Sequence, residues 1–278
     1  MNRKSIVGMF SACAIVLCWI AFHQAKVSAA GSASAPATGP AGPLTLEVGK
    51  GVRMTLALIP AGQFTMGSPE GEKNRQGNEG PQHEVTISKP FYVGICEVTQ
   101  EQYQAVMGKN PSFFKGAKNP VENVTWDNAV EFCKKLSEKT GKTVTLPTEA
   151  QWEYACRAGS KTAFHYGDDA DNAGLGDHAW YVENCKDTTH PVGGKKPNAW
   201  GLYDMHGNVW EWCSDWESPS YAGAGATDPQ GPDRGVSRIL RGGGWSLAAK
   251  YCRSAERVGC EPGQRSNIFG FRVVVESK

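Results

Sequence analysis

The sequence predicts a loop-rich domain of short helices and short strands that is held together by buried aromatic side chains. Glycine is abundant, with 33 residues, and tryptophan occurs nine times in 278 residues. Helical periodicity and runs of β-branched or aromatic residues are both confined to short segments. Two long turn-rich stretches, 160–200 and 217–236, contain or adjoin tryptophans, which favours ordered loops over disorder.

Residues typical of helix N-terminal and C-terminal caps predict three helices. Two of them begin with a Thr-x-x-Gln capping box, at Thr99 and Thr148, in which the threonine accepts from the third helical amide and the glutamine reaches back. The other begins near Thr125 and continues at helical spacing, and a glycine follows each helix. The predicted helices are 99–108, 125–141 and 148–159. Strands are predicted at 52–59, 63–66, 84–88, 91–97, 238–241 and 270–276.

The N-terminus is typical of a secretory signal peptide. Arg3 and Lys4 precede an apolar run over 6–22, and small residues follow up to Ala30. We therefore expect an exported protein, periplasmic or secreted. An uncleaved membrane anchor is the alternative, since the run approaches spanning length, and membrane contact is expected through this segment alone. The predicted organisation is a signal peptide at 1–30, a flexible linker at 31–43 and one domain at 44–278.

Charge and cysteine spacing exclude several classes of partner and metal. The formal net charge is +1, which predicts no nucleic-acid partner and no acidic membrane partner. We expect a peptide, a protein or a small molecule instead. Seven cysteines follow the predicted signal peptide, an odd number, so at least one thiol stays free even if the others pair. The chain has no Cys-x-x-Cys and no His-Glu-x-x-His, so no zinc site is predicted.

Several ordered blocks resemble the formylglycine-generating enzyme family, also called sulfatase-modifying factors. They extend over more than two hundred residues, which makes the resemblance specific. The blocks are 60–68 (PAGQFTMGS), 81–85 (PQHEV) with Phe91-Tyr92, 120–126 (PVENVTW), 146–154 (LPTEAQWEY), 201–216 (GLYDMHGNVWEWCSDW), 238–245 (RILRGGGW) and 270–273 (GFRV). The resemblance implies an α+β fold of the C-type-lectin-like type with little regular structure.

The resemblance also locates a reaction centre, where this chain departs from the family. The family's copper enzymes carry a Cys-x4-Cys pair after a Gly-Gly-Ser-Tyr-like block, and soft thiolates suit copper(I). Counting from the glycines, Leu247 stands at the first position and Cys252 at the second. Counting back from Arg257 and Pro262, neither position is cysteine. Gly244 replaces a serine, so we predict no copper site and keep Cys252 as the only candidate catalytic thiol.

Calcium is the cofactor that the resemblance implies. Asp204 and Glu211, with the carbonyl groups of Gly207 and Val209, match a family Ca²⁺ loop, with Asp in place of Asn at 204. Hard oxygen ligands with two carboxylates suit the ion. The alternative is that both carboxylates bind local amides or an arginine. The family's other calcium segment, around 180–193, diverges here and predicts no ligands.

Other family features give weaker expectations. Iron-dependent relatives use a His-x3-His-x-Glu motif, and no histidine here has that spacing, although ligands could still gather from distant segments. The resemblance implies a Cys156–Cys252 disulfide, whereas the family partner of Cys133 is replaced by Val273. Four arginines beside glycines and aromatics are predicted to tie loop carbonyls and carboxylates together in the core. They are Arg241, Arg253, Arg257 and Arg272.

Two hypotheses for function follow. The chain is an exported binding or envelope protein that lacks copper-dependent oxidation of cysteine to formylglycine, with the glycine-rich loops 217–236 and 242–263 as its ligand surface. Alternatively, it is a periplasmic oxidoreductase or tailoring enzyme that acts on a peptide, a sulfatase or a small molecule. The missing thiolate favours the first hypothesis.

Overall fold

The computed structural model describes residues 42–169 and 171–277. The predicted signal peptide and most of the predicted linker lie outside these residues. Within them, no helix has both the length and the apolar character needed to cross a membrane.

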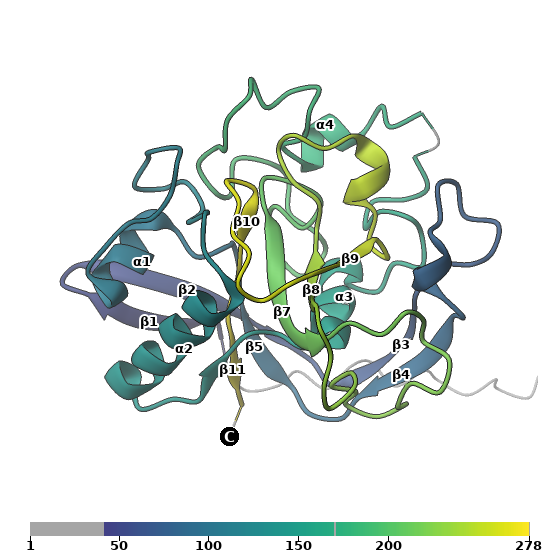
Figure 1. The fold of residues 1–278 in the computed structure, drawn as a ribbon, viewed down its shortest axis with the longest axis horizontal. Helices are drawn as coiled ribbons and strands as arrows, with labels where there is room; N and C mark the ends of the chain where they lie inside the picture. The colour runs from purple at the N-terminus through teal and green to yellow at the C-terminus, as the bar shows by residue number, and fades with distance from the viewer. Residues whose placement is uncertain (1–41, 170, 278) are drawn as a thin grey trace, which may run out of the picture. The chain divides into compact units, whose positions relative to one another are not determined.

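A five-stranded antiparallel sheet is built from both ends of the domain. Its last strand, β11, pairs with β5 and β6, so the C-terminal segment lies inside the sheet that the first strands begin. Two helices, α1 (Gln100–Met107) and α2 (Trp126–Thr140), pack against it (Figure 1). The strand order is β1 (Leu44–Gly49), β2 (Val52–Ile59), β5 (Phe91–Gly94), β11 (Val274–Glu276) and β6 (Val144–Thr145).

A second sheet carries the blocks that resemble the family. Its order is β10 (Phe269–Gly270), β7 (Trp210–Trp216), β8 (Arg238–Arg241) and β9 (Arg257–Cys260), and only β10 runs parallel to its neighbour. Helix α3 (Glu149–Arg157) packs on β7 and β8 and also contacts the hairpin of β3 (Gly62–Met66) and β4 (His83–Ile87). Consequently α3 joins the hairpin to the second sheet.

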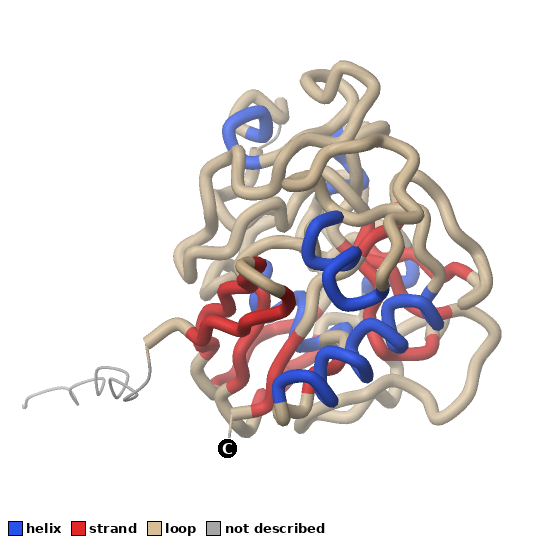
Figure 2. Tube along the Cα trace, turned by 90° about the vertical axis from the view of Figure 1, so that its left-hand side faces the viewer, coloured by secondary structure: helices blue, strands red, loops and turns tan. Residues whose placement is uncertain are grey.

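Long loops make up much of the rest of the domain, as the sequence predicts. Among the described residues between α3 and β7, the one helix is the single turn α4 (Leu175–His178), and short 3₁₀ turns occur at Gly77–Glu79 and Ala249–Cys252. Figure 2 shows loops filling the part of the molecule opposite the strands. These loops are ordered by contact with three buried clusters rather than by backbone ladders.

Buried aromatic side chains anchor those clusters. Trp212 on β7 and Phe132 on α2 lie in the first, Trp152 on α3 lies in the second, and all three are almost completely inaccessible to solvent. An aromatic side chain buries roughly 150–250 Å², so a few of them supply much of the apolar contact in a domain with short elements. The prediction of a fold held by buried aromatics is confirmed.

Candidate functional site

Cys252, the candidate catalytic thiol, is completely buried at the end of the 3₁₀ turn Ala249–Cys252. It lies in a small apolar cluster with Phe164, Leu175 and Tyr181. Burial raises the pKa of the Cys252 thiol to about 12. The thiol is therefore protonated at neutral pH, whereas nucleophilic attack and metal binding both need the thiolate.

The predicted Cys156–Cys252 disulfide is wrong. All seven cysteines within the described residues are free thiols. The two sulfurs face different neighbours: Cys156 Sγ lies 3.8 Å from the Met205 carbonyl oxygen, and Cys252 Sγ lies 4.0 Å from the Ala248 carbonyl oxygen. His206 contacts both segments, because its Nε2 lies 4.0 Å from Cys156 Sγ and its Nδ1 donates to the Cys252 carbonyl oxygen at 2.7 Å.

The loop before Cys252 holds an apolar side chain, Leu247, and a closely packed glycine, Gly244. Leu247 is partly buried against the first core cluster, and its carbonyl oxygen accepts from the Val182 amide at 3.1 Å. A Cβ atom on Gly244 would lie 2.5 Å from Ile268 Cγ1. A serine at position 244 would therefore displace Ile268.

Three histidines that are far apart in sequence meet beside Cys252. His165 Nε2 lies 3.1 Å from His178 Nδ1, and the His165 amide donates to His206 Nε2 at 3.1 Å. Burial lowers all three pKa values, that of His165 to about 4. No group of three or more His, Cys, Asp or Glu side chains in the described part of the chain is arranged around one ion. Sequence spacing gave no sign of this histidine cluster.

The residues of the predicted calcium loop adopt different roles. Asp204 is buried, and its Oδ2 accepts from the Gly193 amide at 2.7 Å, while its Oδ1 accepts from no donor in 42–169 or 171–277. Gly207 lies against the Trp180 backbone, where a Cβ would be 2.4 Å from the carbonyl oxygen. Val209 is in the core.

Glu211 pairs with an arginine instead of standing free. It accepts from Arg272 Nε and Nη2 at 2.6 and 2.7 Å and from Trp152 Nε1 at 2.9 Å. All of these groups lie in the interior. A bidentate pair of this kind is among the strongest that side chains form, so Arg272 occupies both Glu211 oxygens.

Glu97, which the sequence analysis did not single out, lies beside Asp204. It is buried, and neither of its carboxyl oxygens accepts a hydrogen bond from a donor in the described residues. Burial and the neighbouring charges of Asp204 and Glu211 raise its pKa well above the ordinary value, and burial raises the pKa of Asp204 to about 6. Buried carboxyl oxygens without donors suit a bound cation or a retained proton.

The prediction for the four arginines is confirmed. Arg241 pairs with Glu149 and Glu153, and all three side chains are buried. Arg253 binds three glutamates, Glu72, Glu79 and Glu256, and Arg257 binds Glu149. Arg272 also donates to the carbonyl oxygens of Gly94 and Tyr203. These guanidinium groups are thus bound by carboxylates and carbonyl oxygens within the protein, although Arg241 Nε donates no hydrogen bond among the described residues.

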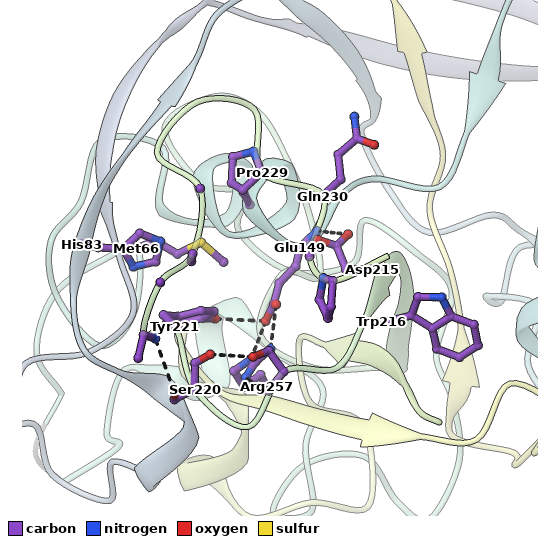
Figure 3. Close-up of a pocket in the computed structure, with 18 residues that line it drawn as sticks. Met66, His83, Glu149, Asp215, Trp216, Ser220, Tyr221, Pro229, Gln230 and Arg257 are labelled. Carbon is purple, nitrogen blue, oxygen red and sulfur yellow. Dashed lines mark hydrogen bonds and ion pairs between the residues drawn. The ribbon is translucent and has the colours of Figure 1, made fainter. Parts of the chain in front are cut away.

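A separate cavity of about 300 Å³ lies beneath the loop that follows β7. Residues of β4, the start of α3, β9 and the loop line it, and Figure 3 shows His83 and Met66 on the side opposite Asp215 and Trp216. The sequence analysis placed a ligand surface in this loop, 217–236, but did not identify Asp215 or His83.

Comparison with known sequences finds the same family along the chain. The model of the sulfatase-modifying factor enzyme 1-like domain matches residues 49–277. The chain is 37% identical over 239 residues to the chaperone protein LppX of Paenibacillus barcinonensis. The match covers 68% of this chain and 78% of that protein. It is 30% identical over 279 residues to the formylglycine-generating enzyme of Streptomyces coelicolor. This match covers 77% of the chain and 87% of the enzyme.

Solved structures agree with the sequence comparison. Treponema denticola variable protein 1 matches with a TM-score of 0.76 at 35% identity. The match covers 84% of this chain and 99% of the other. PvdO from Pseudomonas aeruginosa has a TM-score of 0.77 at 31% identity, over 86% of this chain and 100% of that one. The molecule is thus a loop-rich α+β protein with a C-type-lectin-like fold. The chain belongs to the formylglycine-generating enzyme, or sulfatase-modifying factor, family.

Proposed function

We propose that this protein is an exported binding member of its family that does not oxidise cysteine to formylglycine. The observation that carries the proposal is the state of Cys252, a buried thiol with a raised pKa. Counted from the glycines, the position that pairs with it in the family's copper enzymes is Leu247. Copper(I) needs soft thiolate ligands. One protonated thiol in an apolar cluster provides no such pair.

The proposed partner is a peptide, a protein or a small molecule met in the periplasm or outside the cell. The name of the relative LppX, a chaperone protein, supports a protein partner. The near-neutral formal charge, +1, supports neither nucleic acid nor an acidic membrane surface as a partner.

A tailoring oxidoreductase is the second candidate, and the histidine cluster is the observation that favours it. The 3.1 Å between His165 Nε2 and His178 Nδ1 suits a hydrogen bond. It also suits two ligands of one metal ion at about 2.0–2.1 Å each. No group of three or more His, Cys, Asp or Glu side chains among the described residues could hold a metal ion, so the binding function is the better supported of the two.

Calcium is proposed beside Asp204, with Glu97 in place of Glu211 as the second carboxylate. Three buried oxygens without partners, Asp204 Oδ1 and the two of Glu97, fit a hard cation. The carbonyl groups of Gly207 and Val209 remain the proposed backbone ligands. Glu211 is committed to Arg272. Bound calcium would supply positive charge that offsets the buried carboxylates.

Metal analysis of the purified protein, together with oxygen uptake on a Cys-x-Pro-x-Arg peptide, tests these proposals. We expect calcium, neither copper nor iron, and no peptide-dependent uptake, in the native protein and in Cys252→Ala alike. Stoichiometric copper with uptake that Cys252→Ala abolishes would overturn the binding function. Iron with uptake that His165→Ala abolishes would favour the tailoring enzyme instead.

A further inference from the structure

The cavity beneath the loop after β7 has apolar walls and a floor whose charges are already paired. Arg257 donates to both oxygens of Glu149, at 2.6 and 2.9 Å, and Tyr221 Oη donates to Glu149 Oε1 at 3.0 Å. Arg257 Nη1 also donates to the Ser218 carbonyl oxygen at 2.7 Å. Neither Glu149 nor Arg257 is therefore free to bind a charged ligand. The apolar walls are Met66, Ala150, Trp216, Pro229 and Pro232, with the small residues 222–225 beside them.

Asp215 is the charged side chain on this cavity that has no ionic partner among the described residues. The residue is 3% exposed, and its Oδ2 accepts from the Glu149 amide and from Ser214 Oγ at 2.8 and 3.0 Å. No hydrogen bond within the described chain reaches Oδ1. The nearby Arg238 interacts electrostatically with Asp215. Its guanidinium group donates to the Ser214 carbonyl oxygen and lies 3.5 Å from the centre of the Trp216 ring, and it forms no direct ion pair with Asp215 among the described residues.

His83 offers a second acceptor without a donor. Its Nδ1 lies 3.3 Å from the Pro81 carbonyl oxygen, which can only accept, so Nδ1 carries the proton. Its Nε2 then carries a lone pair, and this atom is buried and has no partner in the described structure. The ring packs against Tyr221, with centroids 5.1 Å apart. Asp215 and His83 thus present acceptors on opposite sides of one apolar cavity (Figure 3).

We propose that this cavity binds a protonated amine or guanidinium group on a short apolar stem, with Asp215 accepting hydrogen bonds from the cation and His83 accepting one from a donor elsewhere on the ligand. A cation pairs with a carboxylate that has no ionic partner, and a second donor on the ligand suits His83 Nε2 across the cavity. The apolar walls fit methylene groups, and about 300 Å³ is the lower limit of ordinary ligand pockets. A free alkylamine and the side chain of lysine or arginine on a polypeptide share this chemistry. The inference rests on the proposed binding function and names its ligand class.

Binding is expected to depend on pH through Asp215. Burial, and then the charge of Glu149, raises the pKa of Asp215 to about 7. The ionised fraction then rises about tenfold between pH 6 and pH 8, while an alkylamine stays protonated. Affinity should rise by a similar factor. Glu149, Arg257 and Tyr221, the other titratable groups beside Asp215, are bound to one another, and Arg238 is stacked on the Trp216 ring.

Calorimetry on the purified protein tests the proposal with three probes. Agmatine and Nα-acetyl-lysine amide are cationic, and Nα-acetyl-norleucine amide is the neutral match. We expect the cationic probes to bind, the neutral probe to bind at least tenfold more weakly, and Asp215→Asn to lose at least tenfold in affinity for the cations. Asp233→Asn, an exposed site on the same loop, is the matched control and should bind like the native protein.

The outcomes distinguish a polypeptide side chain from a free amine as the ligand. They also test the cavity inference separately from the proposed binding function. Tighter binding of the lysine amide points to a polypeptide side chain, and tighter binding of agmatine points to a free amine. Equal binding of the neutral probe, unchanged affinity in a folded Asp215→Asn, or no binding of either cationic probe overturns the inference. Peptide-dependent oxygen uptake overturns the proposed function, whatever the calorimetry gives. His83→Gln leaves the hydrogen bond from the first amide of α3 to Asp215 in place. It therefore provides a second variant if Asp215→Asn does not fold.

Discussion

Glu122 illustrates how single carboxyl groups in this molecule are held out of water. It is buried, its Oε1 accepts from the Phe114 amide at 2.8 Å, and its Oε2 has no partner. Burial raises its pKa to about 7. The folded state therefore keeps a proton on Glu122 that the unfolded chain releases near the ordinary pKa of a glutamate.

The protonation of Glu122 makes stability depend on pH. Because the folded pKa is raised, the native state gives up stability as the pH rises from about 4.5 to about 7, with little further change above. The contribution is on the order of 2 kcal/mol. We expect Glu122→Gln to reduce the loss of unfolding free energy between pH 5 and pH 8, measured by urea denaturation. Glu138→Gln, exposed on α2, should leave it unchanged, and an equal loss in the two variants would refute the assignment.

At the scale of single residues, the sequence predicts the charged groups that form ion pairs better than the buried carboxyl groups that form none. The four arginines could be assigned because a guanidinium beside glycines and aromatics has few roles other than tying loops together. Glu97, Glu122 and Asp215 could not, because each is isolated by side chains that are distant in sequence. Only the folded chain reveals which carboxyl groups lose their water.

Helix α3 shows how an element is fixed by its ends. Thr148 accepts from the Gln151 amide at 3.1 Å, and Gln151 Oε1 accepts from the Thr148 amide at 3.0 Å. The helix then ends at Arg157, with Ala158 in the left-handed region at φ 46°. The predicted capping box is confirmed, and the predicted end near Gly159 is two residues late.

Removal of the Thr148 cap should weaken this element measurably. Thr148→Ala leaves an amide of the first turn without its acceptor, so we expect a loss of about 1 kcal/mol in unfolding free energy. Thr148→Ser keeps the hydroxyl group and should stay within a few tenths of the native value. Urea denaturation of both variants measures the difference. Equal stability of the two would mean that Asp215, which accepts from the next amide, caps the helix alone.

Strand β7 was not predicted, although strands β2 and β8 match their predicted ranges. A strand is normally recognised by alternation between buried and exposed residues. In β7 both faces are buried, with Trp212 in one core cluster and Cys213 in the other. The segment was therefore interpreted only as a family block and a calcium loop.

At the scale of the whole molecule, Arg272 joins the two sheets. It donates to Gly94 at the end of β5 in the larger sheet and pairs with Glu211 on β7 in the smaller one. The arginine and the glutamate are 0% exposed. The loops are thus linked by buried ion pairs in a domain that has no disulfide among its described residues.

Loss of Arg272 should therefore destabilise the entire domain. Arg272→Met leaves Glu211 buried without its cation, which costs about 3–5 kcal/mol. The double variant Arg272→Met/Glu211→Gln should lose less, because no charge remains unpaired. Lys118→Met removes an exposed pair with Glu101 and should change stability by less than about 1 kcal/mol. Thermal denaturation ranks the variants, and a double variant weaker than Arg272→Met would contradict the role of charge.

The overall fold was predictable from the sequence because ordered family blocks span the domain, whereas the candidate site was not. The blocks gave the C-type-lectin-like class and placed Cys252 and the Asp204 segment. They could not give the burial of the Cys252 thiol, the Arg272–Glu211 pair or the meeting of three histidines. Each of these depends on how loops of no regular structure pack on one another.

The contact between Gly244 and Ile268 bears on protein engineering. A designer who wished to install the family's oxidase chemistry would first restore cysteine at 247 and serine at 244. The serine would strike Ile268, whose Cγ1 lies only 2.5 Å from the position of the new Cβ, so a smaller residue would be needed there as well. Residues 244 and 268 would therefore have to be changed together.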